Sequence, residues 1–162
     1  MNRPPLVSAL IDTPARYLDL LQPLLALATR WYVSWQFLKS GWLKLSDWTT
    51  TLDLFRSEYH VPVLSPTTAA VVGTFGELFF PVLLVCGLGG RLGALGLFAV
   101  NLMAVVAYSH VLLSEGFEAA LGQHLLWGFM LAVLAIHGNG PLSLDQLFGM
   151  RRKSPVNTMS MA

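Results

Sequence analysis

The chain has 162 residues, of which 54% are hydrophobic and only 12% are charged, and its net charge is +1. Soluble domains carry about 25% charged residues, so this composition excludes an ordinary soluble globule and predicts an integral membrane protein surrounded by lipid. The net charge alone says nothing about nucleic acid, but the only basic cluster is at residues 151–153, so we expect no nucleic-acid partner. The single cysteine, Cys86, excludes an internal disulfide and a CxxC redox pair.

The first predicted elements are a mobile cytoplasmic tail over residues 1–16 and an apolar span over residues 17–45. The span is longer than the ~20 residues that cross a bilayer, so we expect it to tilt or protrude. A signal peptide cleaved after Ala28 is the alternative. Asp12 and Asp19 disfavour it, and cleavage would leave an apolar remainder too short to span.

The loop that follows contains a predicted amphipathic helix over residues 48–59. Its apolar side chains fall on one helical face, at Trp48, Leu52, Phe55 and Tyr59. Asp47 is the expected N-cap, and Pro62 ends the pattern. We expect this helix in the first extracytoplasmic loop, either on the membrane surface or folded over the bundle, as an interfacial anchor or as a lid over a site.

Three further spans are predicted over residues 67–88, 91–113 and 119–137, which completes a membrane domain over residues 17–148. Residues 149–162 form a flexible basic tail in this prediction. The fold class is therefore all-α, a transmembrane four-helix bundle. Six Lys and Arg residues fall on one side of it and three on the other, so both termini are expected in the cytoplasm.

Two opposite charges lie inside the predicted spans, Arg30 in the first and Glu77 in the second. A charge at the bilayer centre costs roughly 2.5–3.5 kcal/mol on insertion scales, so a partner or a function must retain it. Counted from the predicted cytoplasmic ends of the spans, both lie near mid-membrane. We therefore expect a buried Arg30–Glu77 ion pair, which either fixes helix register or lines a polar pocket for a quinone head group, a proton or a small solute.

Other polar and aromatic residues of the spans extend this predicted pocket. Its expected residues are Arg30, Glu77, Asn101, His110, His124, Trp31 and Trp35. Histidine can hydrogen-bond a quinone carbonyl, and the tryptophans either stack on a flat ligand or form an interfacial belt. No two histidines have a tight metal-site spacing, so we expect no metal, with His60, His110 and His124 as the remaining candidates.

The order of several short motifs resembles that of the DoxX family. Arg30 opens a span, Ser-Gly-Trp-Leu-Lys-Leu follows at residues 40–45, Val-Pro stands at 61–62, and Gly-Asn-Gly-Pro-Leu-Ser-Leu-Asp closes the region at 138–145. Glu77, the Pro-Val-Leu-Leu stretch at 81–84 and Arg-Leu-Gly at 91–93 lie between them. The resemblance implies a bacterial inner-membrane protein linked with quinone-reducing thiosulfate oxidation or a membrane redox complex, and it supplies no catalytic residue set.

The sequence thus favours a membrane subunit or partner of a quinone-linked redox system, in which a separate redox protein carries the electron-transferring centre. Quinone is the candidate cofactor, and a homo-oligomer is compatible with the sequence. No nucleotide, haem or metalloprotease motif is present, which disfavours a self-contained enzyme and favours a non-catalytic subunit. A transporter of a small solute or metal ion and a non-catalytic assembly or scaffold protein are the alternatives.

Overall fold

The computed structural model describes residues 5–89 and 91–149, with side chains from residue 17 onward. This part of the chain is helical and contains no strand, which confirms the all-α prediction. The helices in chain order are α1 (Pro5–Ser46), α2 (Trp48–Ser57), α3 (Pro66–Cys86), α4 (Leu92–Ala107), α5 (Ser109–Leu112), α6 (Glu118–His137) and α7 (Leu144–Leu147). The basic tail predicted at residues 149–162 lies outside the described residues except for Gly149.

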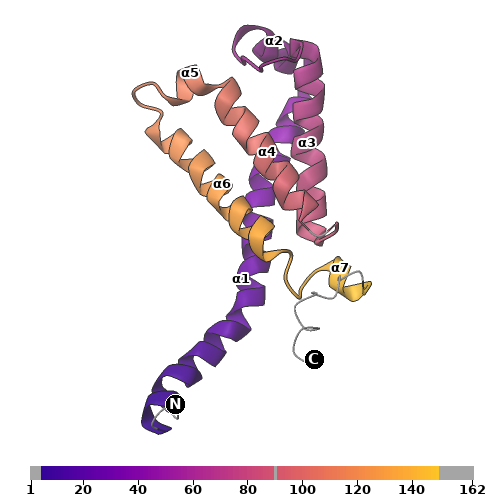
Figure 1. The fold of residues 1–162 in the computed structure, drawn as a ribbon. Coiled ribbons are helices and arrows are strands. Elements are labelled where there is room, and N and C mark those ends of the chain that lie inside the picture. The colour runs from indigo at the N-terminus through magenta and orange to yellow at the C-terminus, as the bar shows by residue number, and fades with distance from the viewer. Residues whose placement is uncertain (1–4, 90, 150–162) are drawn as a thin grey trace, which may run out of the picture.

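The first helix is longer than the sequence analysis expected. It begins at Pro5, so residues 5–16, which were assigned to a tail, are helical. Its 42 residues extend about 63 Å at 1.5 Å per residue, roughly twice the thickness of a bilayer core. Figure 1 shows its N-terminal part running past all the other helices. The start of α1 therefore does not mark the level at which its neighbours begin or end.

Two described helices, α3 and α6, are long and apolar enough to cross a membrane, and α4 is apolar but has only 16 residues. The predicted third span over residues 91–113 is divided into two helices in the structure. The helix ends at Ala107, Tyr108 interrupts it, and the short α5 follows. The four-span arrangement remains a prediction, because length and composition support two spans.

The core lies where α1, α3, α4 and α6 meet, since α3 packs against both α1 and α4, and α6 packs against α4 and α1. Its buried apolar residues are Val33, Phe37, Leu84, Ala94, Leu97, Leu131 and Leu134. Gly93 lets α4 approach α3 closely, because an added Cβ there would lie 2.8 Å from the Leu84 backbone nitrogen. Small residues at helix contacts are typical of membrane bundles.

The amphipathic helix of the first loop is confirmed as α2, and it is folded over the bundle. Asp47 caps it, accepting a hydrogen bond from the Thr50 backbone nitrogen at 3.0 Å. Its apolar face contacts the first turns of α3. Phe55 of α2 is buried in this contact, together with Ala69 and Ala70 of α3. We call this end of the molecule the α2 end and the opposite end of the bundle the α7 end (Figure 1).

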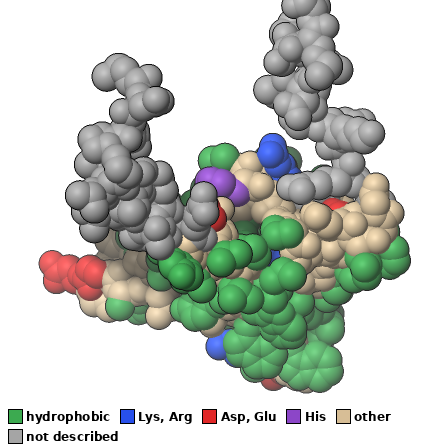
Figure 2. Space-filling model, turned by 90° about the horizontal axis from the view of Figure 1, so that it is seen from below, with side chains coloured by type: hydrophobic (Ala, Val, Ile, Leu, Met, Phe, Trp, Pro, Cys, Tyr) green, Lys and Arg blue, Asp and Glu red, His purple; other side chains and the backbone are tan. Residues whose placement is uncertain are grey.

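Large apolar side chains also cover the outside of the helices. Exposed examples come from every long helix and include Leu24, Trp42, Val72, Leu102 and Phe129. Figure 2 shows hydrophobic side chains gathered over much of the face seen from below. An apolar exterior of this extent suits contact with lipid tails.

Candidate functional site

At the α7 end, Arg30 is buried to 1% exposure and donates hydrogen bonds only to backbone carbonyl oxygens among the described residues. Its Nε donates to Leu84 at 2.7 Å, and its Nη2 donates to Val85. Its Nη1 donates to Asn139 at 2.9 Å and to Leu142 at 2.7 Å. The guanidinium thus joins α1 to the last turn of α3 and to the segment after α6.

The chemistry of a helix C-terminus explains this arrangement. The last carbonyls of a helix have no partner within it and carry partial negative charge. A guanidinium offers five N–H donors in a planar fork. Gly87 ends α3 with a left-handed φ of 66°, and a Cβ there would lie 2.7 Å from Arg30 Nη2 and 2.5 Å from Ser143 Cβ. Arg30 therefore fits against a position that has no side chain.

The closing motif at residues 138–145 folds onto the same end. The Asp145 backbone nitrogen donates to Gly87 O at 3.2 Å, and Asp145 Oδ1 accepts from the Gly89 nitrogen at 3.0 Å. Asn139 Nδ2 donates to Asp145 Oδ2 at 3.4 Å. Motif residues far apart in the sequence thus form one network around the end of α3.

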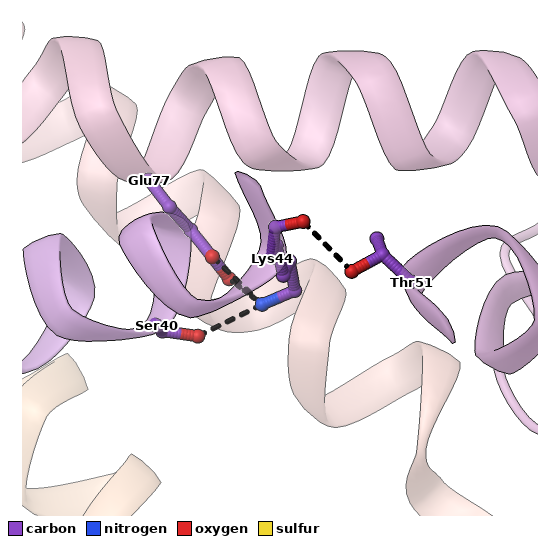
Figure 3. A network of polar contacts seen from close by, with 4 residues as sticks. All are labelled: Ser40, Lys44, Thr51 and Glu77. Atoms are coloured by element: carbon purple, nitrogen blue, oxygen red, sulfur yellow. Dashed lines mark hydrogen bonds and ion pairs between the residues drawn. The ribbon is translucent and has the colours of Figure 1, made fainter. Parts of the chain in front are cut away.

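At the α2 end, Glu77 of α3 forms an ion pair with Lys44 of α1 (Figure 3). Lys44 Nζ lies 2.8 and 2.7 Å from the two Glu77 carboxylate oxygens and also donates to Ser40 Oγ at 2.8 Å. The side chains are 18% and 10% exposed. Thr51 of α2 donates to the Lys44 carbonyl at 3.0 Å, which ties α2 to this pair.

The predicted Arg30–Glu77 ion pair was wrong. The α1 helix starts well before the bundle, so counting residues from an assumed membrane edge put Arg30 at the height of Glu77. Arg30 instead lies level with Leu84 and Val85 in the last turns of α3. Glu77 is at least seven residues earlier, about 10 Å along the helix, where α1 presents Lys44.

Between the two ends, Asn101 of α4 and His124 of α6 form a reciprocal contact. Asn101 Nδ2 donates to the His124 carbonyl oxygen at 3.0 Å, and Asn101 Oδ1 lies 2.9 Å from His124 Nδ1. Gly128 allows this approach, because a Cβ added there would lie 3.3 Å from Asn101 Nδ2. The two residues that the sequence placed in one pocket are therefore in direct contact.

This contact fixes the tautomer of a neutral His124. A backbone carbonyl oxygen only accepts, so the Asn101 amide must present its NH₂ group there and its oxygen to Nδ1. The oxygen also only accepts, so Nδ1 carries the hydrogen and Nε2 keeps its lone pair. His124 thus offers Nε2 as a hydrogen-bond acceptor.

Trp127, one turn along α6, lies beside His124 with ring centroids 5.0 Å apart. Its Nε1–H is buried and meets no acceptor in the described part of the chain. A buried N–H without a partner costs about 1–3 kcal/mol. The buried hydroxyls of Ser34 and Thr74 also have no partner among the described residues. Trp127 differs from them because it lies beside the ring of His124, which makes this place a candidate site for a polar ligand.

The remaining predicted pocket residues lie elsewhere. Trp31 and Trp35 are 56% and 55% exposed on the outside of α1. His110 lies in α5 and faces His60 across 3.4 Å between their Nδ1 atoms. Tyr59 is nearby, and burial, with smaller contributions from Tyr108, Glu77 and Glu58, raises the pKa of its hydroxyl.

A comparison with known protein families identifies the family of the chain. The family model described as DoxX matches residues 25–110, which is more than half of the sequence. The chain belongs to the DoxX family. No curated protein and no solved structure matches it.

The matched region of this DoxX protein includes Arg30, Lys44, Glu77 and Asn101, and it ends before α6. The family and the apolar helices together identify a membrane protein. Sequence reasoning missed the contacts of two residues, Lys44 as the partner of Glu77 and Trp127 beside His124. Lys44 stood within a quoted motif without a role, and Trp127 was one of five tryptophans with no local signal to separate it from an interfacial anchor.

Proposed function

We propose that this DoxX protein is a membrane subunit or partner of a quinone-linked redox system. In this proposal a quinone head group binds beside α4 and α6, at Asn101, His124 and Trp127. The supporting observation is the buried Trp127 Nε1–H without an acceptor among the described residues, next to a histidine whose free ring nitrogen is an acceptor. One donor and one acceptor suit the carbonyl of a quinone and the hydroxyl of a quinol.

The residues have separate roles in this proposal. A bound quinone takes up two electrons and two protons on reduction. Trp127 Nε1–H donates to a quinone oxygen, which satisfies its buried donor. His124 Nε2 accepts a proton when His124 is neutral and donates one when the imidazole is protonated. Asn101 keeps the imidazole in one orientation.

The surroundings of the site favour a ligand that dissolves in the bilayer. The neighbouring side chains on α4 and α6 are large, apolar and exposed, among them Leu102, Leu125, Leu126 and Phe129. A quinone with an isoprenoid tail could approach along this face from the hydrocarbon. Arg30 and Glu77 already hold partners of their own, so the proposal gives them structural roles.

The partner and the location follow from the same proposal. A second protein carries the redox centre that exchanges electrons with the quinone. The membrane is the bacterial inner membrane, with both chain ends in the cytoplasm, as the distribution of Lys and Arg indicates. Cysteine-accessibility labelling at residue 2 and at residue 116 tests this orientation: only the second is expected to react from outside.

Quinone binding is tested with the full chain in lipid nanodiscs and a short-chain ubiquinone analogue, by equilibrium titration. Trp127→Phe removes the N–H and keeps an aromatic ring, and it should weaken binding about 2–10-fold, the equivalent of one hydrogen bond. His124→Gln should weaken it similarly. Trp35→Phe, on the exposed side of α1, is the matched control and should bind as the wild type does.

Two results would reject the proposal: no saturable binding by the wild type, or equal affinities for the wild type, Trp127→Phe and His124→Gln. Solute or metal flux into vesicles, lost in these variants, would favour the transporter. Loss of protein abundance alone, with unchanged quinone affinity, would favour the scaffold.

A further inference from the structure

The α2 end brings together two histidines that are fifty residues apart in the sequence, His60 and His110. Their Nδ1 atoms lie 3.4 Å apart, within hydrogen-bond distance, so without an ion one ring N–H donates to the other nitrogen, and the ring centroids are 4.7 Å apart. Both side chains are exposed. The pair lies apart from Asn101, His124 and Trp127, so it is independent of the proposed quinone site.

The separation of the two nitrogens matches a particular coordination geometry. Two imidazole nitrogens bound at about 2.0–2.1 Å to one tetrahedral ion lie about 3.3–3.4 Å apart. Adjacent ligands of a square-planar ion at the same bond length lie only about 2.8–3.0 Å apart. The 3.4 Å between the two nitrogens therefore fits a tetrahedral ion. Zn²⁺ accepts imidazole ligands and is commonly tetrahedral.

The protein holds the two rings in this arrangement by contacts on both sides. The His60 backbone nitrogen donates to Ala107 O at 2.8 Å, which ties the loop after α2 to the end of α4, three residues before His110. Tyr108 packs edge-to-face on His110 and on Tyr59, with centroids 5.5 and 5.2 Å apart. The ligands are therefore oriented by the fold before any ion arrives, which reduces the cost of binding.

We propose that His60 and His110 form a two-histidine Zn²⁺ site in which both Nδ1 atoms coordinate the ion. No group of three or more His, Cys, Asp or Glu that could hold a metal occurs in the described part of the chain. Two water molecules or external ligands complete the tetrahedron, one more than in catalytic zinc sites, which have three protein ligands and one exchangeable position. Bound Zn²⁺ links the loop between α2 and α3 to the joint between α4 and α5.

The test is calorimetric titration of ZnCl₂ into the full chain in chelator-free detergent micelles. The wild type should bind one Zn²⁺ per chain at this site. His60→Gln and His110→Gln should each weaken binding at least ~10-fold. Even the loss of a residue that only hydrogen-bonds a metal ligand lowers metal affinity about 10–100-fold. His137→Gln is the matched control, since His137 is also exposed but bonds to Val133 O at the end of α6.

A second measurement uses the wild type alone and so does not depend on the folding of any variant. Co²⁺ in place of Zn²⁺ should give the intense visible absorption of a tetrahedral centre. The weak absorption of a six-coordinate ion would overturn the proposal. So would the absence of Zn²⁺ binding, or binding that both His60→Gln and His110→Gln leave unchanged.

Discussion

The two ends of the bundle each hold a cation of α1, in different ways. Arg30 and Lys44 both belong to α1 and lie about 21 Å apart along it. At the α7 end, Arg30 is surrounded by neutral backbone carbonyls of α3 and of the segment after α6. At the α2 end, Lys44 meets the full negative charge of Glu77 (Figure 3).

The difference follows from the two side chains. Guanidinium spreads one charge over a planar fork of donors and is less strongly hydrated than an ammonium group, so several partial charges can satisfy it. Ammonium is a compact point charge and is better matched by a carboxylate. Arg30 consequently joins three segments of backbone, whereas Lys44 makes a pairwise contact that one substitution on α3 can remove.

The largest expected effect comes from Arg30→Gln. Hydrogen bonds from a charged donor contribute about 1.5–3 kcal/mol each, and up to four carbonyls would lose one. We expect the free energy of unfolding to fall by several kcal/mol, measured by SDS titration in mixed micelles. Arg30→Lys should recover only part of the loss. Arg56→Gln, which breaks an exposed ion pair with Asp53, should change the free energy by less than ~1 kcal/mol; an equally small effect at Arg30 would contradict this account.

The next largest effect comes from alanine substitutions at the α7 end, which separate the cost of a left-handed backbone from the cost of a steric clash. Gly87 and Gly89 both have left-handed φ values, 66° and 72°, so alanine at either costs about 1–2 kcal/mol. Only at Gly87 would the new Cβ collide with Arg30 and Ser143, while at Gly89 its nearest neighbour is 3.6 Å away. Gly87→Ala should therefore lower the melting temperature clearly more than Gly89→Ala. Equal decreases in melting temperature would mean that Arg30 and its carbonyl acceptors move to accommodate the new Cβ without cost.

A double-mutant cycle tests which cation Glu77 pairs with. Lys44→Met and Glu77→Gln should each destabilise the protein, and their coupling energy should be about 1–3 kcal/mol because each leaves the other group without its partner. Arg30→Gln and Glu77→Gln touch no common partner, so their effects should add within ~0.5 kcal/mol. Strong coupling between Arg30→Gln and Glu77→Gln would instead support the ion pair between Arg30 and Glu77 that the sequence predicted.

Local patterns predicted much of the fold. The apolar runs placed α3 and α6 to within two residues, and the spacing of four apolar residues with an acidic cap placed α2. These features depend on neighbours in sequence, which periodicity and capping rules describe directly.

The parts that failed depend on the relative height of helices. Periodicity places a residue on a face of its helix but does not give the level at which that helix meets its neighbours. Arg30 was therefore matched to Glu77 instead of to the end of α3, and the start of α1 was set twelve residues too late. His60 and His110 were judged by their spacing in sequence, which carries no information about a contact made by folding.

The smallest expected effect concerns the cap of α2. Hydrogen bonds from the Thr50 side chain and backbone lower the pKa of Asp47, so its folded pKa lies below the unfolded value of ~3.9. Its contribution to stability is present above the unfolded pKa and is lost as pH falls through the folded pKa. Asparagine also caps helices but does not titrate.

Hydrogen exchange of residues 48–57 in the wild type should therefore match that of Asp47→Asn near neutral pH and become faster than it in acid. Comparing the two proteins at each pH removes the intrinsic pH dependence of exchange. Asp47→Ala should exchange faster than both at neutral pH, because it has no cap. A wild-type-to-Asp47→Asn ratio that stays constant with pH would show that the charge of Asp47 adds nothing to a cap that a neutral side-chain oxygen already provides.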